Sequence, residues 1–389
     1  MKPIYLDNNA TTRVAEEVRD AMLPYFCDLY GNPSSMHSFG GQVEAQLEEA
    51  RAKVASVIGA SSPSEIVFTS CGTESDNAAI RGVLDAMPNK RHVITTRVEH
   101  PAVNNLAKFL SRRGYAVTEL PVDQQGMIDP DQLKDEIRDD TAIVSIMYAN
   151  NETGTIFPIE KISQIVKEYG IIFHTDAVQA VGKLPLDMSR GTIDLLALSG
   201  HKLHAPKGIG ALYIKRGTRF NPFIIGGHQE RGRRGGTENI PYIIGLGVAI
   251  ELAEKHLEEE NQRVRSMRDR LESIILKEIP STRLNGHPIH RLPNTANISF
   301  EFVEGEAILL MLDQYGIAAS SGSACTSGSL EPSHVLRAMG IPFTYAHGSI
   351  RFSFSRYNTD EDVDTVLEVL PGIISKLRDI SPFTPKAGA

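Results

Sequence analysis

Short apolar runs of strand length alternate with stretches of helical spacing over most of this chain. The strand-like runs lie at 65–69, 93–95, 142–148, 171–173 and 193–198. Helical stretches lie before and between them, as at 41–58, where apolar side chains keep helical spacing ahead of Gly59. The alternation from about residue 65 to 215 predicts an α/β fold with a mostly parallel sheet covered by helices.

The pattern outside this region predicts further elements. Residues 4–6 form a predicted strand, 16–26 a helix loosened at Pro24, and 243–277 a long helical stretch. A loop at 285–288 opens a region with short strands at 295–300 and 350–353. We expect a large domain over 15–260 and a smaller α+β domain formed by 1–14 and 261–389.

Composition narrows the class of protein. The chain has 389 residues, of which 41% are hydrophobic and 23% charged, as in an ordinary globular protein. A net charge of -8 predicts no nucleic-acid or anionic-membrane partner. Three widely spaced cysteines, Cys27, Cys71 and Cys325, argue against a disulfide framework and a thiolate zinc site. With no apolar run of about 18 residues, we expect a cytoplasmic protein.

Two polar side chains stand just after buried runs. Lys202 follows the apolar segment 193–198, and Asp176 follows 171–173. Partial desolvation at the floor of a pocket lowers the pKa of a lysine amine and makes it nucleophilic. A Schiff-base lysine and an aspartate that pairs with a pyridine nitrogen are what pyridoxal phosphate (PLP) requires. The alternatives are a surface lysine and an aspartate that only caps a helix.

Other candidates also fall at predicted strand ends, where parallel sheets bind their ligands. The small-residue turn at 70–75 precedes a predicted helix at 76–84 and could cradle a phosphate, or be a capped turn that binds nothing. His100 could stack on a pyridine ring and carry protons, or only cap a helix. Asn150 and Asn151 could offer amides to a ring hydroxyl or a carboxylate, or only form a turn.

Three features lie outside the predicted sheet. The Gly- and Arg-rich segment 226–239 predicts either a mobile loop with donors for an anion or a solvated basic linker. Arg351 could clamp a substrate carboxylate, or form an internal salt bridge. Cys325 lies among small polar residues, a setting that favours an accessible nucleophile over the buried, inert cysteine that is more common.

These motifs resemble those of the NifS/IscS cysteine desulfurases, which are fold-type I PLP enzymes related to the class-V aminotransferases. The resemblance extends over essentially the whole chain. It is carried by the segments 5–12, 31–35, 73–77, 99–101, 150–152, 174–179 and 200–202, and by the serine-rich cysteine loop at 320–329. The segments 201–207 and 227–231 most resemble the nitrogen-fixation (NifS) branch.

The resemblance implies PLP as cofactor and assigns its contacts. The implied cofactor-binding residues are Gly72, Thr73, Asn151, Asp176, Gln179, Ser199, His201, Lys202 and, from the neighbouring subunit of a homodimer, Thr237. Thr73, Ser199 and His201 would hold the phosphate, and Gln179 and Asn151 would face the ring hydroxyl. The implied substrate-binding residues are Asn32, Asn151 and Arg351.

The implied reaction converts L-cysteine to L-alanine. Lys202 would take the α-proton, His100 would carry the proton of the substrate thiol, and Cys325 would receive the sulfur as a persulfide. An Fe–S scaffold of the NifU/IscU type would accept that sulfur, with nitrogenase as the expected destination. No metal is expected in the resting enzyme, although Cys325 could contact a nascent cluster through the scaffold.

Two other interpretations stay open. Another PLP enzyme, such as an aminotransferase or a selenocysteine lyase, would share Asp176 and Lys202 but would not need an accessible Cys325. A non-enzymatic sulfur-assembly partner or PLP-binding regulator would bind the cofactor without turning over cysteine.

Overall fold

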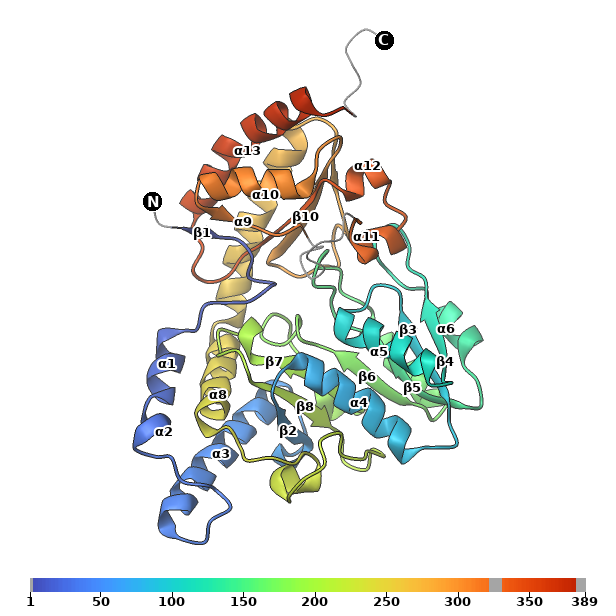
Figure 1. The fold of residues 1–389 in the computed structure, drawn as a ribbon, viewed down its shortest axis with the longest axis vertical. Helices are drawn as coiled ribbons and strands as arrows, with labels where there is room; N and C mark the ends of the chain where they lie inside the picture. The colour runs from blue at the N-terminus through green and yellow to red at the C-terminus, as the bar shows by residue number, and fades with distance from the viewer. Residues whose placement is uncertain (1–2, 322–330, 383–389) are drawn as a thin grey trace.

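A seven-stranded sheet forms the centre of the larger part of the molecule (Figure 1), as a computed structural model shows for residues 3–321 and 331–382. The strands are β2 (Ile66–Thr69), β3 (His92–Thr96), β4 (Ala116–Leu120), β5 (Thr141–Ser145), β6 (Ile172–Asp176), β7 (Leu195–Ser199) and β8 (Gly210–Ile214). Their order is β2-β8-β7-β6-β5-β3-β4, and only β8 runs antiparallel to its neighbours. The predicted mostly parallel α/β sheet is confirmed.

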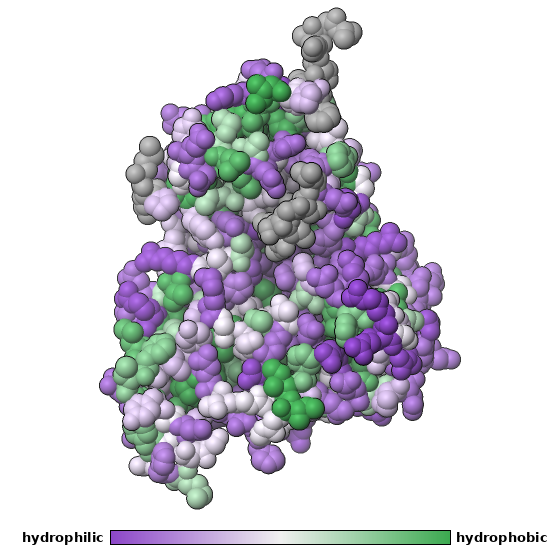
Figure 2. All heavy atoms as spheres, viewed as in Figure 1, coloured by the Kyte–Doolittle hydropathy of each residue, from purple (hydrophilic) through white to green (hydrophobic). Residues whose placement is uncertain are grey.

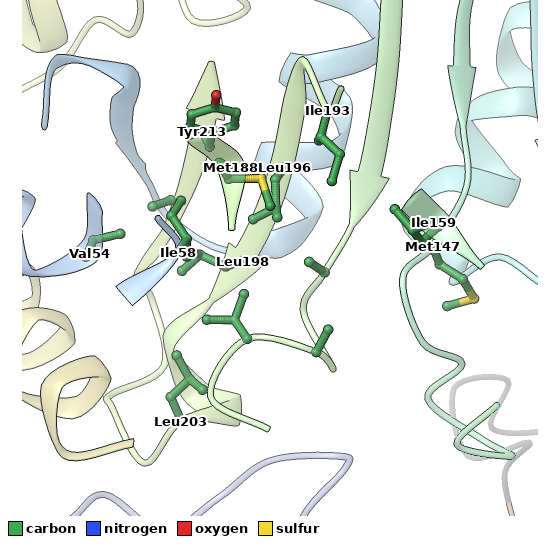
Figure 3. Packing of buried hydrophobic residues seen from close by; sticks show 14 of the residues in the cluster. Val54, Ile58, Met147, Ile159, Met188, Ile193, Leu196, Leu198, Leu203 and Tyr213 are labelled. Atoms are coloured by element: carbon green, nitrogen blue, oxygen red, sulfur yellow. The ribbon is translucent and has the colours of Figure 1, made fainter. Parts of the chain in front are cut away.

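Helices cover both faces of this sheet because each strand alternates its side chains between two buried cores. On β8, Ala211 and Tyr213 join a core with helices on one face, whereas Leu212 and Ile214 join the core on the other. The first core contains residues of α1 (Glu16–Met22), α3 (Ser38–Val57), α7 (Ile159–Glu168) and α8 (Ile240–Lys255), and Figure 3 shows part of it. The second contains residues of α4 (Gly72–Ala86) and α5 (Pro101–Arg112).

A smaller group of elements lies above the large sheet in Figure 1. Its antiparallel sheet has the order β12-β10-β9, formed by β9 (Thr282–Leu284), β10 (Thr295–Phe300) and β12 (Ser349–Ser353), and β1 (Ile4–Tyr5) pairs with β11 (Ile317–Ala318). Helices α9 (Leu257–Glu278), α10 (Gly305–Gln314) and α13 (Asp360–Ile380) share a third core with these strands. The domain bounds at 14/15 and 260/261 stay a prediction.

The remaining elements are short. They are the α-helices α2 (Pro24–Cys27), α6 (Pro130–Glu136), α11 (His334–Ala338) and α12 (Phe343–Ala346), and 3-10 turns at Pro63–Glu65, Met188–Arg190, Gly200–Lys202 and Gln229–Gly232. Polar side chains cover much of the face drawn in Figure 2. In the part of the chain that is described, no helix combines the length and apolar character needed to cross a membrane.

Three element bounds differ from the sequence prediction. The helix predicted at 76–84 already begins at Gly72, so the small-residue turn is its first turn. The strand predicted to reach Tyr148 ends at Ser145, although the Tyr148 amide still donates to the Asp176 carbonyl (2.8 Å). The stretch 243–277 is two helices, which meet at His256. The break at Pro24 is confirmed, since α1 ends at Met22.

Candidate active site

A cavity of about 200 Å³ lies at the carboxyl ends of β2, β5, β6 and β7, where a parallel sheet binds its ligands. Nine of the residues predicted from the sequence line it: Gly72, Thr73, His100, Asn151, Asp176, Gln179, Ser199, His201 and Lys202. Most of the predicted site is therefore assembled by one chain. The structure provides the arrangement, whereas the roles of these residues remain predictions.

Lys202 reaches this cavity through the tight turn that follows β7. A side chain at Gly200 would meet Ile209 at 2.8 Å, so a glycine allows the turn to fold against the sheet. The Lys202 Nζ donates to the carbonyl oxygens of Asn9 (2.5 Å) and Ala10 (2.6 Å). Burial, and next the positive charge of Arg351, lower the pKa of this amine to about 7. At neutral pH the amine is therefore partly unprotonated, as a nucleophile or base requires.

Asp176 ends β6 and is buried. Its Oδ1 accepts from the Val178 amide (2.9 Å), so it does cap the following turn. Burial raises the pKa of its carboxyl, and the nearby His100 acts in the opposite direction. A cation bound next to Asp176 would stabilise its ionised form. The sequence predicts such a pairing between an ionised Asp176 and a protonated pyridine nitrogen.

The first turn of α4 and Ser199 give the cavity features that suit a phosphate. The first turn of α4, beginning at Gly72, directs free amides there, and a side chain at Gly72 would meet Val178 at 2.7 Å. The buried Ser199 Oγ has no hydrogen-bond partner among the described residues. An unsatisfied buried hydroxyl beside helix amides fits an oxyanion ligand. His201 borders the same cavity, and burial lowers its pKa to about 4, so it is neutral there.

His100 and Asn151 also line the cavity. The His100 Nδ1 accepts from the Ala102 amide (3.2 Å) and so caps α5, while its ring still borders the cavity. Burial lowers the pKa of His100. Asn150 forms the predicted turn, since its Oδ1 accepts from the amides of Glu152 and Thr153 (both 2.9 Å). Of the two asparagines, Asn151 is the one that borders the cavity.

Within the described ranges, three predicted site residues do not line the cavity. Arg351 lies beside it, donating to the Asn151 carbonyl (3.0 Å) and to Asp7 Oδ1 (2.7 Å), so the salt-bridge alternative is confirmed, while the carboxylate clamp stays a prediction. Its buried Nε has no partner within the described ranges. Asn32 and Thr237 are exposed and do not border the cavity. Cys325 lies outside the described residues.

The segment 226–239 is tied to α3, β2 and α4 and is not a freely solvated linker. Glu230 is buried and accepts from Arg51 Nη1 (2.6 Å) and from the Phe68 amide (3.1 Å). Arg234 pairs with Glu74 on α4 (2.9 Å). The arginines thus serve internal ion pairs in part, which the charge pattern alone could not distinguish from anion donors.

Sequence reasoning missed two residues of the site. The buried Asn9 accepts from Lys202 and Gln179 through its carbonyl, and its side-chain amide donates to the Asn151 carbonyl (3.1 Å). Asp76 borders the cavity, and burial holds its pKa well above the usual range. Asn9 lies in the segment 5–12 and Asp76 in the segment 73–77, both of which carry the family resemblance. Membership in these segments is the signal that could have identified them. Among the described residues, no group of three or more His, Cys, Asp or Glu side chains could hold a metal ion.

Comparisons with known proteins agree over nearly the full length. The sequence model of the aminotransferase class-V family matches residues 4–366. A cysteine desulfurase of Trichormus azollae is 62% identical over 383 residues, covering 98% of this chain and 96% of its own. The cysteine desulfurase NifS of Azotobacter vinelandii is 58% identical over 383 residues, with 98% and 95% covered.

Solved structures give the same result. A NifS-like protein superposes with a TM-score of 0.90 at 40% identity, over 96% of this chain and 100% of that one. The structure described as SspA in complex with cysteine gives a TM-score of 0.80 at 37% identity, over 92% of this chain and 100% of that one.

Proposed function

Because the chain belongs to the class-V aminotransferase family, and within it to the cysteine desulfurases, we propose that it converts L-cysteine to L-alanine with PLP as cofactor. The observation that carries the proposal is the meeting of Lys202 and Asp176 in one cavity with the amides of α4. When bound, PLP stabilises negative charge at the substrate α-carbon.

The chain's own residues fit this cofactor. The α4 amides, Thr73 and the unpartnered Ser199 hydroxyl would hold the phosphate, and Asp176 would face the ring nitrogen. Gln179 and Asn151 would address the ring hydroxyl, with His100 over the ring. Lys202, whose pKa is lowered to about 7, can bind the cofactor covalently and afterwards take the substrate α-proton on Nζ.

The substrate and its sulfur require residues at the edge of the cavity. The unpartnered Nε of Arg351 offers a donor to the substrate carboxylate. The Cys325 thiolate would attack the sulfur of L-cysteine, so that an S–S bond forms while the C–S bond breaks. The substrate β-carbon keeps the electron pair of the broken bond and gains a proton. The products are alanine and a persulfide, and His100 would carry the thiol proton. A scaffold protein of the NifU/IscU type would then accept the sulfur for Fe–S assembly, and the likeness to NifS supports nitrogen fixation as the pathway.

A homodimer would bring Thr237 and Asn32, which do not line the cavity of their own chain, to the cavity of the neighbouring chain. Thr237 and Asn32 are exposed in one chain. Large apolar side chains are exposed between α2 and α3, with Tyr30 at 70% and Met36 at 105% of full exposure, and Ile225, just before the segment 226–239 that contains Thr237, is 87% exposed. Figure 2 shows hydrophobic side chains among polar ones over the lower part of the molecule, where α1, α2 and α3 lie. We infer that a second copy covers this surface.

The test is a cysteine-dependent alanine assay on the PLP-loaded protein. We expect Lys202→Ala to lower alanine formation by at least about 1000-fold, because both the covalent anchor and the base are lost. Lys167→Ala on α7 is a matched control, and it should keep the native rate. A wild-type protein that binds PLP but forms no alanine from L-cysteine would refute the proposed activity.

A further inference from the structure

A second lysine lies directly behind the candidate cofactor site. Lys183 follows β6 and stands four residues after Gln179. Its Nζ donates to the Gln179 carbonyl oxygen (3.3 Å) and to the side-chain Oε1 (3.5 Å). Its own carbonyl accepts from Asn261 Nδ2 on α9 (2.8 Å). The amine is therefore held against Gln179, which lines the cavity, and the Lys183 backbone is joined to α9.

This contact decides how the Gln179 carboxamide is oriented. The oxygen faces the Lys183 amine, and the nitrogen donates to the Asn9 carbonyl (3.0 Å). A flipped amide would place two donors against a donor and an oxygen against an oxygen. The Asn9 carbonyl also accepts from Lys202 Nζ. Lys183, Gln179, Asn9 and Lys202 thus form one continuous hydrogen-bonded chain.

Lys183 and Lys202 also both line a small cavity, and they interact through their charges. The groups that act on Lys202 are Arg351 and Lys183, which disfavour its protonation, and Asp7 and Asp176, which favour it. Glu260 is the carboxylate that acts on Lys183, and burial lowers the pKa of Lys183 to about 8. Lys183 therefore keeps most of its charge at neutral pH. Glu260 also pairs with Arg356 (3.1 Å), so it keeps a cation if Lys183 is replaced.

We propose that Lys183 is a positioning residue of this active site, which fixes the Gln179 carboxamide with its nitrogen toward the cavity and disfavours a second positive charge on Lys202. The first part rests on the proposed function, because the nitrogen would then face the PLP ring hydroxyl. The second part depends only on the chain itself.

The first experiment measures the protonation of Lys202 without cofactor. In the full-length protein freed of PLP, the rate of Lys202 modification by an amine reagent is followed against pH by mass spectrometry. The inflection of this rate–pH curve marks the pKa of Lys202. Lys183→Met should move the inflection up by about 0.5 to 1 pH unit, because a neighbouring cation is lost. Lys183→Arg keeps the charge and should restore the inflection to within about 0.2 pH unit of wild type. Lys167→Met on α7 is the control and should not move it.

The second experiment uses the PLP-loaded protein. With the Gln179 carboxamide released, Lys183→Met should weaken PLP binding by about fivefold or more, and Lys183→Arg should recover most of the loss. A Lys183→Met protein with an unchanged Lys202 inflection would overturn the charge role, and unchanged PLP affinity would overturn the orienting role. If wild type binds no PLP, the proposed function and the orienting role both fail, while the inflection still decides the charge role.

Discussion

Glu99 shows how one buried carboxyl near the site makes the stability of the fold depend on pH. It is fully buried, and its Oε1 accepts from the Thr96 hydroxyl (2.7 Å) and the Met147 amide (3.1 Å). Burial raises the pKa of its carboxyl to about 8 from the 4.5 of an exposed glutamate. Between these values the folded protein holds a proton that the unfolded chain lacks. Its stabilising contribution is complete below pH 4.5 and is lost as pH rises through 8.

Glu99→Gln should therefore become more stable relative to wild type as pH rises. The amide keeps the acceptor for Thr96 and Met147 and has no proton to lose. We expect the difference in unfolding free energy to move in favour of glutamine by at most about 1.4 kcal/mol per pH unit between pH 5 and 8. Urea unfolding at several pH values measures it, with the exposed Glu278→Gln as control. A difference that stays constant with pH would contradict a protonated Glu99.

Asp176→Asn tests the predicted partner of the pyridine nitrogen. Asparagine keeps the bond from the Val178 amide, so the turn after β6 should stay folded. It cannot supply a negative charge, and we expect alanine formation to fall by about 100-fold or more while PLP remains bound. The PLP content and the cysteine turnover are measured on the same sample. Turnover within threefold of wild type would exclude this role for Asp176.

The residues that sequence could identify are those whose chemistry is tied to a strand end. Lys202 and Asp176 follow buried apolar runs, and parallel strands bring their carboxyl ends together. Asn9 and Lys183 could not be recognised in this way. Asn9 acts through its backbone carbonyl on a lysine 193 positions away, and Lys183 acts through Gln179. No local pattern encodes either contact.

Among the elements, α4 is the one whose start matters most for the site. The sequence places small residues at 70–75, which suit both a turn and the first turn of a helix, so the start at Gly72 was not predictable. Periodicity did locate the body of the helix. The pattern over 243–277 predicts one helical stretch because the break at His256 contains neither glycine nor proline, the residues that mark a helix end in a sequence.

Gly72→Ala should weaken PLP binding, because the added carbon meets Val178 at 2.7 Å and displaces the first turn of α4 from the turn after β6. We expect the affinity for PLP to fall by at least about tenfold. The matched control is Gly372→Ala in α13, where an added carbon meets nothing within 4 Å. Equilibrium titration with PLP separates the two variants. Equal affinities would show that α4 does not pack closely against the cofactor.

For the whole molecule, the fold class followed from the alternation of strands and helices, but the complete site did not. Nine predicted residues meet in one chain, whereas Asn32 and Thr237 stay exposed. Periodicity describes one chain and carries no information on what a second copy contributes. The segment 7–12 illustrates a further limit, because its contacts join the first residues to Asn151, Lys202 and Arg351 far along the chain.

The dimer predicts a mass in solution of about 85 kDa, twice the 42.6 kDa of the chain. Light scattering after size-exclusion chromatography measures it. Replacing the exposed Tyr30 and Met36 by glutamate should shift the mass toward one chain and lower PLP affinity, because Thr237 would then be missing from each cavity. An active wild-type protein with the mass of one chain would contradict the shared site.

The most direct test of the central claim is the mass of the intact, PLP-loaded protein after brief incubation with L-cysteine, together with an alanine assay. The account predicts a gain of one sulfur atom that maps to Cys325, with alanine formed. Cys325→Ser should keep its PLP and gain no sulfur. Alanine without the adduct would leave a PLP lyase and contradict the persulfide. No alanine, or native sulfur release by Cys325→Ser, would contradict the desulfurase mechanism itself.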